Sequence, residues 1–106
     1  MNLTEKQILE MKVIEALETC YDPEIPVNIY ELGLVYLIEI SDSGDVRIKM
    51  TLTAPSCPVA ASLPGEVQTK VGAIEGVRSA QVEIVWDPPW NPGKMSESAK
   101  LRLGMI

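Results

Sequence analysis

The sequence predicts an α+β fold: a two-layer sandwich in which helices pack on one face of a three-stranded mixed sheet. Apolar residues recur at helical spacing near the N-terminus and again after residue 58. Two segments of alternating apolar and polar residues flank a turn at residues 42–45. A third such segment follows the second helix, and a short helix ends the chain. The predicted order is therefore α-β-β-α-β-α.

Length and charge limit the classes of function. The 106 residues correspond to a single domain, residues 1–106. The net charge is −6, and the window between Lys12 and Arg47 contains eight Asp and Glu residues but no Lys or Arg. An acidic surface repels phosphate backbones, so we expect no nucleic-acid partner. The acidity is compatible with an ordinary solvated surface, a metal ion or a basic partner.

The chain has no sign of a membrane segment or of secretion. No apolar run reaches the roughly 18 residues of a membrane span. Residues 1–12 are charged and lack the apolar stretch of a signal peptide. Cys20 and Cys57 are far apart and form no disulfide framework. We expect a cytoplasmic protein with no membrane contact.

The first helix has a clear start and stop. Thr4 and Gln7 have the spacing of a capping box, and Leu3 and Ile8 have that of a hydrophobic staple. Asp22 and Pro23 stop the helix. Its predicted buried face consists of Leu9, Val13, Ala16, Leu17 and Cys20. We interpret Cys20 as a core residue, with assistance to Cys57 as the alternative.

Residues 22–33 predict an ordered loop that packs on the core. The prolines at positions 23 and 26 disfavour a helix. The segment is nevertheless too apolar to remain in water, since it contains Ile25, Val27, Ile29 and Leu32. Ordered loops of this kind commonly carry function.

The two strands of the predicted hairpin each bury one face. The first strand turns Leu34, Tyr36, Ile38 and Ile40 inward, and the second turns Val46, Ile48, Met50 and Leu52 inward. Thr51 and Thr53 then lie on the open face of the second strand. There they are either site residues or ordinary strand formers.

The second helix follows Cys57. Pro58 suits the first helical position, which places Cys57 at or next to the N-cap. The positive end of the helix dipole there favours the thiolate, which is both a nucleophile and a metal ligand. Pro64 and Gly65 predict a kink or two short helices that meet there, and Gly76 is expected to end the helix. The apolar stripe is Val59, Leu63, Val67, Val71 and Ile74.

The third strand turns Ala80, Val82, Ile84 and Trp86 inward. Residues 86–92 are expected to be rigid and extended, and a last helix should begin after Ser96 and stop at Gly104. We interpret Trp86 and Trp90 as packing anchors, with ligand stacking as the alternative.

The predicted topology brings distant segments together. Antiparallel pairing puts the start of the first strand beside the end of the second. The second helix carries the chain back, so the third strand ends at the same edge. The loop after Asp22, the segment around Cys57, and Trp86 with Asp87 should therefore converge. We take this edge of the sheet as the candidate site.

The chemistry of the candidate residues favours a metal ligand over a catalytic nucleophile. The chain has no His, which excludes a Cys–His pair and Cys/His zinc spacing. The carboxylates Asp22, Glu24 and Asp87 would raise the pKa of a nearby thiol unless a cation lay between them. Thiolate with oxygen ligands fits iron or zinc at an exchangeable site. The alternatives are an inert Cys57 at a tight turn and a turn-forming Asp22.

Four segments resemble a known family of small iron–sulfur cluster assembly domains, with SufT-type and PaaD-type members and cytosolic iron–sulfur targeting factors. They are Asp22–Pro26 (Asp-Pro-Glu-Ile-Pro), Leu32–Val35 (Leu-Gly-Leu-Val), Thr53–Pro58 (Thr-Ala-Pro-Ser-Cys-Pro) and Trp86–Trp90 (Trp-Asp-Pro-Pro-Trp). The resemblance covers nearly the whole chain. No cysteine follows Cys57, unlike in PaaD-type members. No ATPase domain is attached, unlike in some iron–sulfur carrier ATPases whose leading segment resembles this domain. We therefore expect a stand-alone SufT-like factor.

The resemblance implies a non-enzymatic role in maturing iron–sulfur proteins. It implies that Cys57 is the main ligand, with Asp22 and Glu24 beside it, and that iron or an iron–sulfur cluster is held transiently. Thr51, Thr53, Trp86 and Asp87 are expected to form the supporting wall. The implied partners are iron–sulfur assembly proteins and client apoproteins.

The number of available ligands predicts that a cluster would be shared between chains. Iron–sulfur clusters usually take four thiolates, and Cys57 supplies one. A second protomer, a client or a small thiol must complete the site, and a homodimer is one way to do so. The alternative is an adaptor that recruits clients or assembly machinery without binding metal.

Overall fold

A computed structural model describes residues 1–22, 25–53 and 62–105, and it has the predicted α+β architecture. The sheet has the strand order β1-β2-β3, with β1 and β2 antiparallel and β2 and β3 parallel. The elements are α1 (Leu3–Leu17), α2 (Ile29–Leu32), β1 (Val35–Ile40), β2 (Asp45–Met50), α3 (Leu63–Gly72), β3 (Ser79–Ile84), the 3₁₀ turn η2 (Pro92–Lys94) and α4 (Glu97–Arg102).

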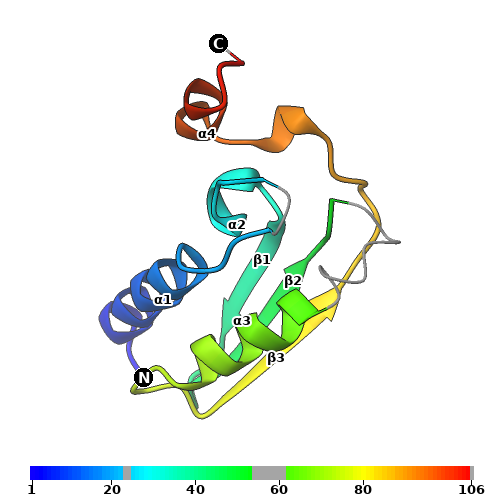
Figure 1. Ribbon diagram of the computed structural model, residues 1–106. Coiled ribbons are helices and arrows are strands. Elements are labelled where there is room, and N and C mark those ends of the chain that lie inside the picture. Colours follow the sequence, from blue (N-terminus) through cyan, green and yellow to red (C-terminus); the bar gives the residue numbers. More distant parts are fainter. Residues whose placement is uncertain (23–24, 54–61, 106) are drawn as a thin grey trace.

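Two helices cover one face of the sheet, and two shorter ones lie beyond its end. Helices α1 and α3 pack against each other over the sheet, whereas α2 and α4 contact each other at the end where β1 begins (Figure 1). The opposite face of the sheet is open and carries exposed Glu39, Arg47 and Glu83. None of the described helices is long and apolar enough to cross a membrane.

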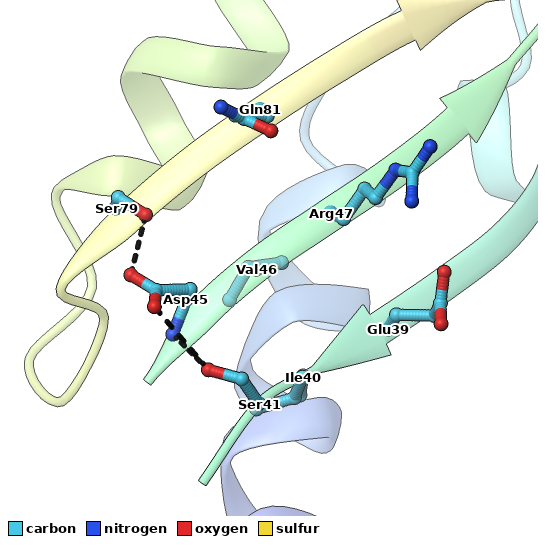
Figure 2. Close-up of a pocket in the computed structure, with 8 residues that line it drawn as sticks. All are labelled: Glu39, Ile40, Ser41, Asp45, Val46, Arg47, Ser79 and Gln81. Atoms are coloured by element: carbon cyan, nitrogen blue, oxygen red, sulfur yellow. Dashed lines mark hydrogen bonds between the residues drawn. The ribbon is translucent and has the colours of Figure 1, made fainter. Parts of the chain in front are cut away.

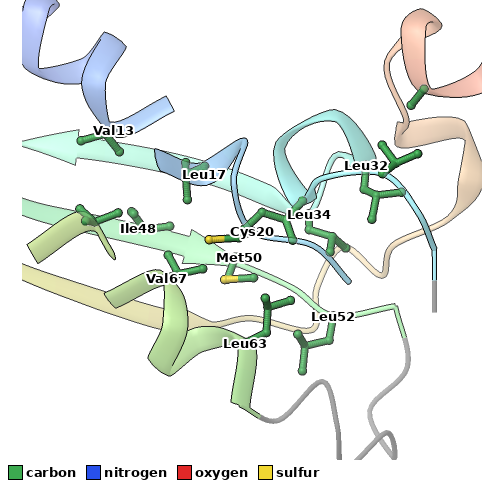
Figure 3. Close-up of a cluster of buried hydrophobic side chains, with 14 of the residues drawn as sticks. Val13, Leu17, Cys20, Leu32, Leu34, Ile48, Met50, Leu52, Leu63 and Val67 are labelled. Carbon is green, nitrogen blue, oxygen red and sulfur yellow. The ribbon is translucent and has the colours of Figure 1, made fainter. Parts of the chain in front are cut away.

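The core lies between the sheet and α1 and α3. Alternate residues of β2, namely Val46, Ile48 and Met50, are at most 1% exposed, as the period of two predicts. Val13, Leu17 and Cys20 pack on them from the α1 side, and Leu63, Val67 and Val71 do so from α3 (Figure 3). The core therefore uses most of the apolar positions expected from the sequence.

The start of α1 differs from the capping-box prediction, which is wrong. Asn2 is the N-cap, and its side-chain oxygen accepts a hydrogen bond from the Glu5 N–H at 2.8 Å. Thr4 therefore lies inside the helix. Leu3 and Ile8 are 71% and 50% exposed, so they form no staple. Asn is at least as good an N-cap as Thr, and here it lies two residues earlier.

Helix α1 also ends before Cys20. It stops at Leu17, because the Thr19 hydroxyl and the Thr19 N–H both donate to the Ala16 carbonyl in a tight turn. Cys20 then lies in the following loop, where its carbonyl accepts from the Ile29 N–H at 2.8 Å. It is fully buried, as predicted, although it is not helical.

The segment 22–33, predicted as a loop because of its two prolines, contains a short helix. Helix α2 is a single turn capped by Asn28, whose side-chain oxygen accepts from the Glu31 N–H at 2.9 Å. Gly33 ends it with a φ of 79°, a backbone conformation that favours glycine. Ile29 and Leu32 are buried, so this segment packs on the core as expected.

A bulge in β1 changes which residues face inward. Val35 pairs with Met50 and Leu37 with Lys49, which leaves Tyr36 as an extra residue. Val35 packs against the core, whereas Tyr36, predicted inward, lies at the rim. Beyond the bulge, Ile38 and Ile40 keep the predicted orientation. Leu34, which was also predicted inward, is fully buried, so the bulge changes the predicted orientation at Val35 and Tyr36.

Helix α3 accommodates Pro64 and Gly65 in its first turn, where a missing N–H costs no hydrogen bond. The earlier helical segment that would meet α3 at Pro64 and Gly65, with Pro58 and Val59, lies outside the described residues. The helix ends at Gly72 rather than near Gly76. Helix α4 begins after Ser96 as predicted, since the Ser96 hydroxyl oxygen accepts from the Ala99 N–H at 3.1 Å.

Candidate functional site

The candidate site lies at the end of the sheet where β2 finishes. The Thr51 N–H donates to the Leu34 carbonyl at 2.8 Å, and the Val85 N–H donates to the Met50 carbonyl at 2.9 Å. The chain after β2 is thus held between the segments that precede β1 and follow β3. These contacts confirm the predicted convergence for the segments before β1 and after β3, whereas the segment around Cys57 lies outside the described residues.

Asp22 and Thr53 meet across this junction. Asp22 is only 3% exposed, and its Oδ2 accepts a hydrogen bond from the Thr53 hydroxyl at 3.2 Å. A bridge between Tyr21 and Asn28 closes the loop that carries Asp22. Two residues named from the sequence, 31 positions apart, are therefore in contact.

Thr51 is not on an open face, and that expectation is wrong. β2 ends at Met50, so the next residue leaves the pleat of the sheet, and Thr51 is 1% exposed. Its hydroxyl oxygen is the buried side-chain atom without a hydrogen-bond partner in the described part of the chain. Buried hydroxyls are normally paired, so this group requires an explanation.

A hollow of about 340 Å³ opens beside Thr51. It is lined by Thr51, Leu52, Thr53, Trp86, Pro89 and Trp90, a set that we call the tryptophan hollow. Trp90 packs against the core, and its indole N–H donates to the Leu32 carbonyl at 2.7 Å, which confirms its interpretation as an anchor. Trp86, predicted inward, is 49% exposed because β3 ends two residues earlier.

The segment that carries the two tryptophans makes a second contact with β1. The Tyr36 hydroxyl donates to the Pro88 carbonyl at 2.8 Å, and the Lys94 ammonium lies 5.1 Å from the centre of the Tyr36 ring. Burial raises the pKa of Tyr36, and the charge of the neighbouring Asp87 raises it further. Asp87 itself is exposed. Sequence reasoning missed Tyr36 and Lys94, because the bulge that turns Tyr36 outward leaves no signal in the alternation.

Cys20 is a poor metal ligand in this structure. It is fully buried, and its thiol donates to the Ala16 carbonyl at 3.6 Å. Burial is the largest cause of a raised pKa for this thiol, so the neutral form is favoured.

The remaining predicted ligands, Cys57 and Glu24, lie outside the described residues. Within residues 1–22, 25–53 and 62–105, no group of three or more Cys, Asp or Glu side chains is arranged to hold a metal ion. The described part of the chain thus contributes Asp22, the two threonines and the tryptophan hollow to the candidate site.

A larger hollow on the open face of the sheet is a separate feature. It measures about 500 Å³ and lies toward the start of β2, at the other end of that strand from Thr51 (Figure 2). Hydrogen bonds join three of its polar residues: the Ser79 hydroxyl donates to Asp45 Oδ1 at 2.6 Å, and the Asp45 N–H donates to the Ser41 hydroxyl at 3.0 Å. We assign it no functional role.

The fold and the sequence together define the class of this protein. The chain belongs to the iron–sulfur cluster assembly protein family, whose profile matches residues 10–84. This membership confirms the resemblance drawn from the sequence motifs.

Individual relatives are similar along most of their length. The chain is 43% identical over 97 residues to an Fe-S protein maturation auxiliary factor of Porphyromonas gingivalis, covering 92% of each chain. It is 39% identical over 84 residues to the Fe-S protein maturation auxiliary factor SufT of Staphylococcus aureus, covering 79% of this chain and 96% of SufT. A crystal structure of a domain of unknown function, DUF59, from Bacillus anthracis superposes with a TM-score of 0.88 at 34% identity, covering 99% of this chain and 100% of that one.

Proposed function

We propose that this protein is a non-enzymatic, cytoplasmic maturation factor that handles iron or iron–sulfur clusters through Cys57, with Asp22 and Glu24 as neighbouring ligands. Membership of the iron–sulfur cluster assembly family carries this proposal. The two relatives described above are named as auxiliary factors of Fe-S protein maturation rather than as enzymes. Iron or cluster is the cargo of the protein, and assembly proteins and client apoproteins are its partners.

The surroundings of Asp22 support its role as an oxygen ligand. Its carboxylate is almost completely buried, and the Thr53 hydroxyl fixes one of its oxygens at 3.2 Å. A hydrogen bond of this kind orients a ligand and tunes its basicity. Thr53 is four residues from Cys57 in the sequence. A thiolate and a carboxylate together suit iron at a site from which it can be released.

The small number of ligands supports transfer rather than storage. A cluster usually takes four thiolates, and Cys20 is buried in its thiol form. We propose that a second protomer, an assembly protein or a client supplies the remaining ligands. A ligand set shared in this way favours release of the cargo when the partner changes.

Anaerobic reconstitution with ferrous iron and sulfide tests the proposal. We expect bound iron and a visible absorption band for the wild-type chain, at least about tenfold less of both for Cys57→Ser, and weaker retention for Asp22→Asn. The matched control is Cys20→Ala, which removes the other cysteine and should leave iron binding intact. A colourless wild-type protein, or colour that survives Cys57→Ser, contradicts the proposal.

An adaptor without a metal site is the second candidate, and the exposed Trp86, which lines the tryptophan hollow, favours it. The two candidates differ in their dependence on Cys57. If Cys57→Ala abolishes client maturation while partner capture continues, the cargo-handling function stands. If client maturation also continues, the protein acts as an adaptor.

A further inference from the structure

We propose that this protein pairs with a second copy of itself along the free edge of β3, so that two three-stranded sheets join into one continuous sheet. The two β3 strands would run antiparallel about a twofold axis at Val82, the commonest symmetry of protein dimers. The unpaired edge of β3, and the side chains that such pairing places opposite one another, carry this inference.

The outer edge of β3 has unpaired backbone groups. β3 is the last strand in the order β1-β2-β3. Among the described residues, no backbone hydrogen bond joins Ser79–Ile84 to a segment other than β2. The Val85 N–H donates to the Met50 carbonyl, so alternate residues before it direct their backbone groups away from β2. These residues are Ala80, Val82 and Ile84.

The two edges of the sheet differ in how well they are protected against pairing. β1 has a bulge that leaves Tyr36 as an extra residue, and a bulge is one of the devices that keep an edge strand from pairing. β3 pairs with β2 in regular register over Ser79–Ile84 and contains no proline. A regular edge of this kind is a template for another strand.

A hollow of about 370 Å³ lies along the edge of β3. It is lined by Arg47, Gln68, Gln81, Val82 and Glu83. Gln68 belongs to α3, on the covered face of the sheet, and Gln81 lies on the open face (Figure 2), so the hollow passes around the edge. Nearby in α3, a Cβ added to Gly72 would first meet Ala80, at 3.9 Å. The absence of a side chain at Gly72 gives a second copy room to approach.

The apolar side chains of β3 are less covered than those of the central strand. Alternate residues of β2 are at most 1% exposed, whereas Ala80, Val82 and Ile84 on the same face of β3 are only half-buried. A neighbouring strand would continue the apolar row and remove part of this surface from water, which is favourable.

The sequence of β3 complements itself, which favours a second copy as the occupant. Pairing centred on Val82 places Gln81 of each copy opposite the partner's Glu83. The amide of Gln81 can donate to that carboxylate, and no like charges lie directly opposite within the strand pair. On the covered face, Ala80 lies opposite the partner's Ile84. A pair centred on Glu83 would instead place two carboxylates opposite each other.

Antiparallel pairing keeps the two candidate sites apart. Thr51 and Trp86 lie just beyond the ends of β2 and β3, and these ends point in opposite directions in the two copies. Each copy would keep its own site and take further ligands from an assembly protein or a client. The inference does not depend on Cys57, so it can be tested in Cys57→Ser protein and can fail separately from the proposed function.

Sedimentation equilibrium of the Cys57→Ser chain measures the association. We expect a reversible dimer with a dissociation constant on the order of 100 μM, because one strand pair buries less than the roughly 1,600 Å² of a standard interface. Added salt should strengthen the dimer, since both copies carry a net charge of −6. A protein that is monomeric at about 1 mM in high salt overturns the inference.

Charge changes at position 81 test the register. Gln81→Glu places two carboxylates opposite each other at two points and should weaken the dimer about tenfold, whereas Gln81→Lys should strengthen it. Gln81→Glu combined with Glu83→Gln restores the match and should restore pairing. The control is Glu39→Gln on β1, which changes the net charge as Gln81→Lys does and should have little effect. Failure of the double variant to restore pairing, or equal effects of Glu39→Gln and Gln81→Lys, overturns the inference.

Amide hydrogen exchange locates the interface. The outward amides of Ala80, Val82 and Ile84 should exchange more slowly as the protein concentration rises, because the partner strand then accepts their hydrogen bonds. The alternate amides of β3, which donate to β2, should change little. Protection that appears in β1 instead of β3 would show that the other edge is the interface and would contradict the proposal, as would protection in neither strand.

Discussion

Thr51 is buried, and its hydroxyl has no hydrogen-bond partner among the residues that the structure describes, which has a measurable cost in stability. An unpaired buried hydroxyl costs about 1–3 kcal/mol. We predict that Thr51→Val, which replaces the hydroxyl by a methyl group, raises the free energy of unfolding by about 1 kcal/mol. Urea denaturation of the metal-free protein measures this change.

The control for Thr51 is the threonine two residues later. The Thr53 hydroxyl donates to the buried Asp22 carboxylate, so Thr53→Val should lower the free energy of unfolding by about 1–3 kcal/mol. Changes of the same sign in both variants would contradict the assignment of the unpaired hydroxyl to Thr51.

The buried thiol of Cys20 should make the free energy of unfolding depend on pH in the alkaline range. Burial raises the pKa of its thiol above the ordinary 9.0, so the folded chain keeps the proton to higher pH than the unfolded chain does. The protonated Cys20 thiol therefore contributes to the free energy of unfolding. This contribution is fully present below pH 9 and is lost as the pH rises through the pKa of the folded state.

The measurement compares two proteins above pH 9. In a Cys57→Ser background, the free energy of unfolding should fall with pH more steeply than in Cys57→Ser with Cys20→Ala, by up to about 1.4 kcal/mol per pH unit. Alkylation of Cys20 by iodoacetamide at neutral pH should require unfolding. Equal alkylation rates in native and unfolded protein would rule out the buried thiol.

Individual residues of the site differed in how far the sequence could predict them. The contact between Asp22 and Thr53 agrees with the sequence analysis, because the strand directions put the start of the first strand beside the end of the second. The burial of Thr51 depends on β2 ending at Met50, one residue before the alternation itself ends. A repeating pattern does not specify where backbone pairing stops. The alternation therefore predicted Thr51 on the open face of the sheet, whereas the residue is buried.

At the level of elements, α2 ends at a glycine that no other residue can replace without strain. Gly33 has a φ of 79°, and a Cβ added there would overlap the Lys94 carbonyl oxygen and lie 2.8 Å from the Lys94 carbonyl carbon. We predict that Gly33→Ala lowers the free energy of unfolding by about 2–4 kcal/mol, as measured by urea denaturation.

Gly65 provides the matched control for Gly33. It lies in the first turn of α3, and an added Cβ would meet nothing within 4 Å. Gly65→Ala should therefore raise the free energy of unfolding by up to about 1 kcal/mol, since alanine is the better helix former. If Gly33→Ala lowered the free energy of unfolding by less than an average surface substitution does, the Lys94 segment would move aside freely and the prediction would be wrong.

Elements with a strong period were predictable, and those held by tertiary contacts were not. β2 and β3 alternate without interruption, and their burial follows the sequence. Helix α2 has one turn and follows two prolines, so its four residues, Ile29–Leu32, carry no helical period. It exists because Asn28 caps it and because Ile29 and Leu32 are buried.

For the whole molecule, the fold class and strand directions followed from element order alone. Once β1 and β2 form a hairpin and α3 returns the chain, the ends of β2 and β3 must meet the start of β1. The course of residues 85–96 could not be derived in this way. It depends on the Trp90 indole hydrogen bond to Leu32 and on the Tyr36 hydroxyl, both of which join residues more than 50 positions apart.

The position of the first residue decides how the protein should be tethered for single-molecule or surface measurements. The Met1 ammonium donates to the Asp42 carbonyl at 2.9 Å, which anchors this terminus at the turn between β1 and β2. Thr51 and the tryptophan hollow lie at the other end of the sheet, and the last helix stands on the α2 side (Figure 1). A linker attached at Met1 therefore leaves the tryptophan hollow facing solution, whereas one attached after α4 brings the support toward it.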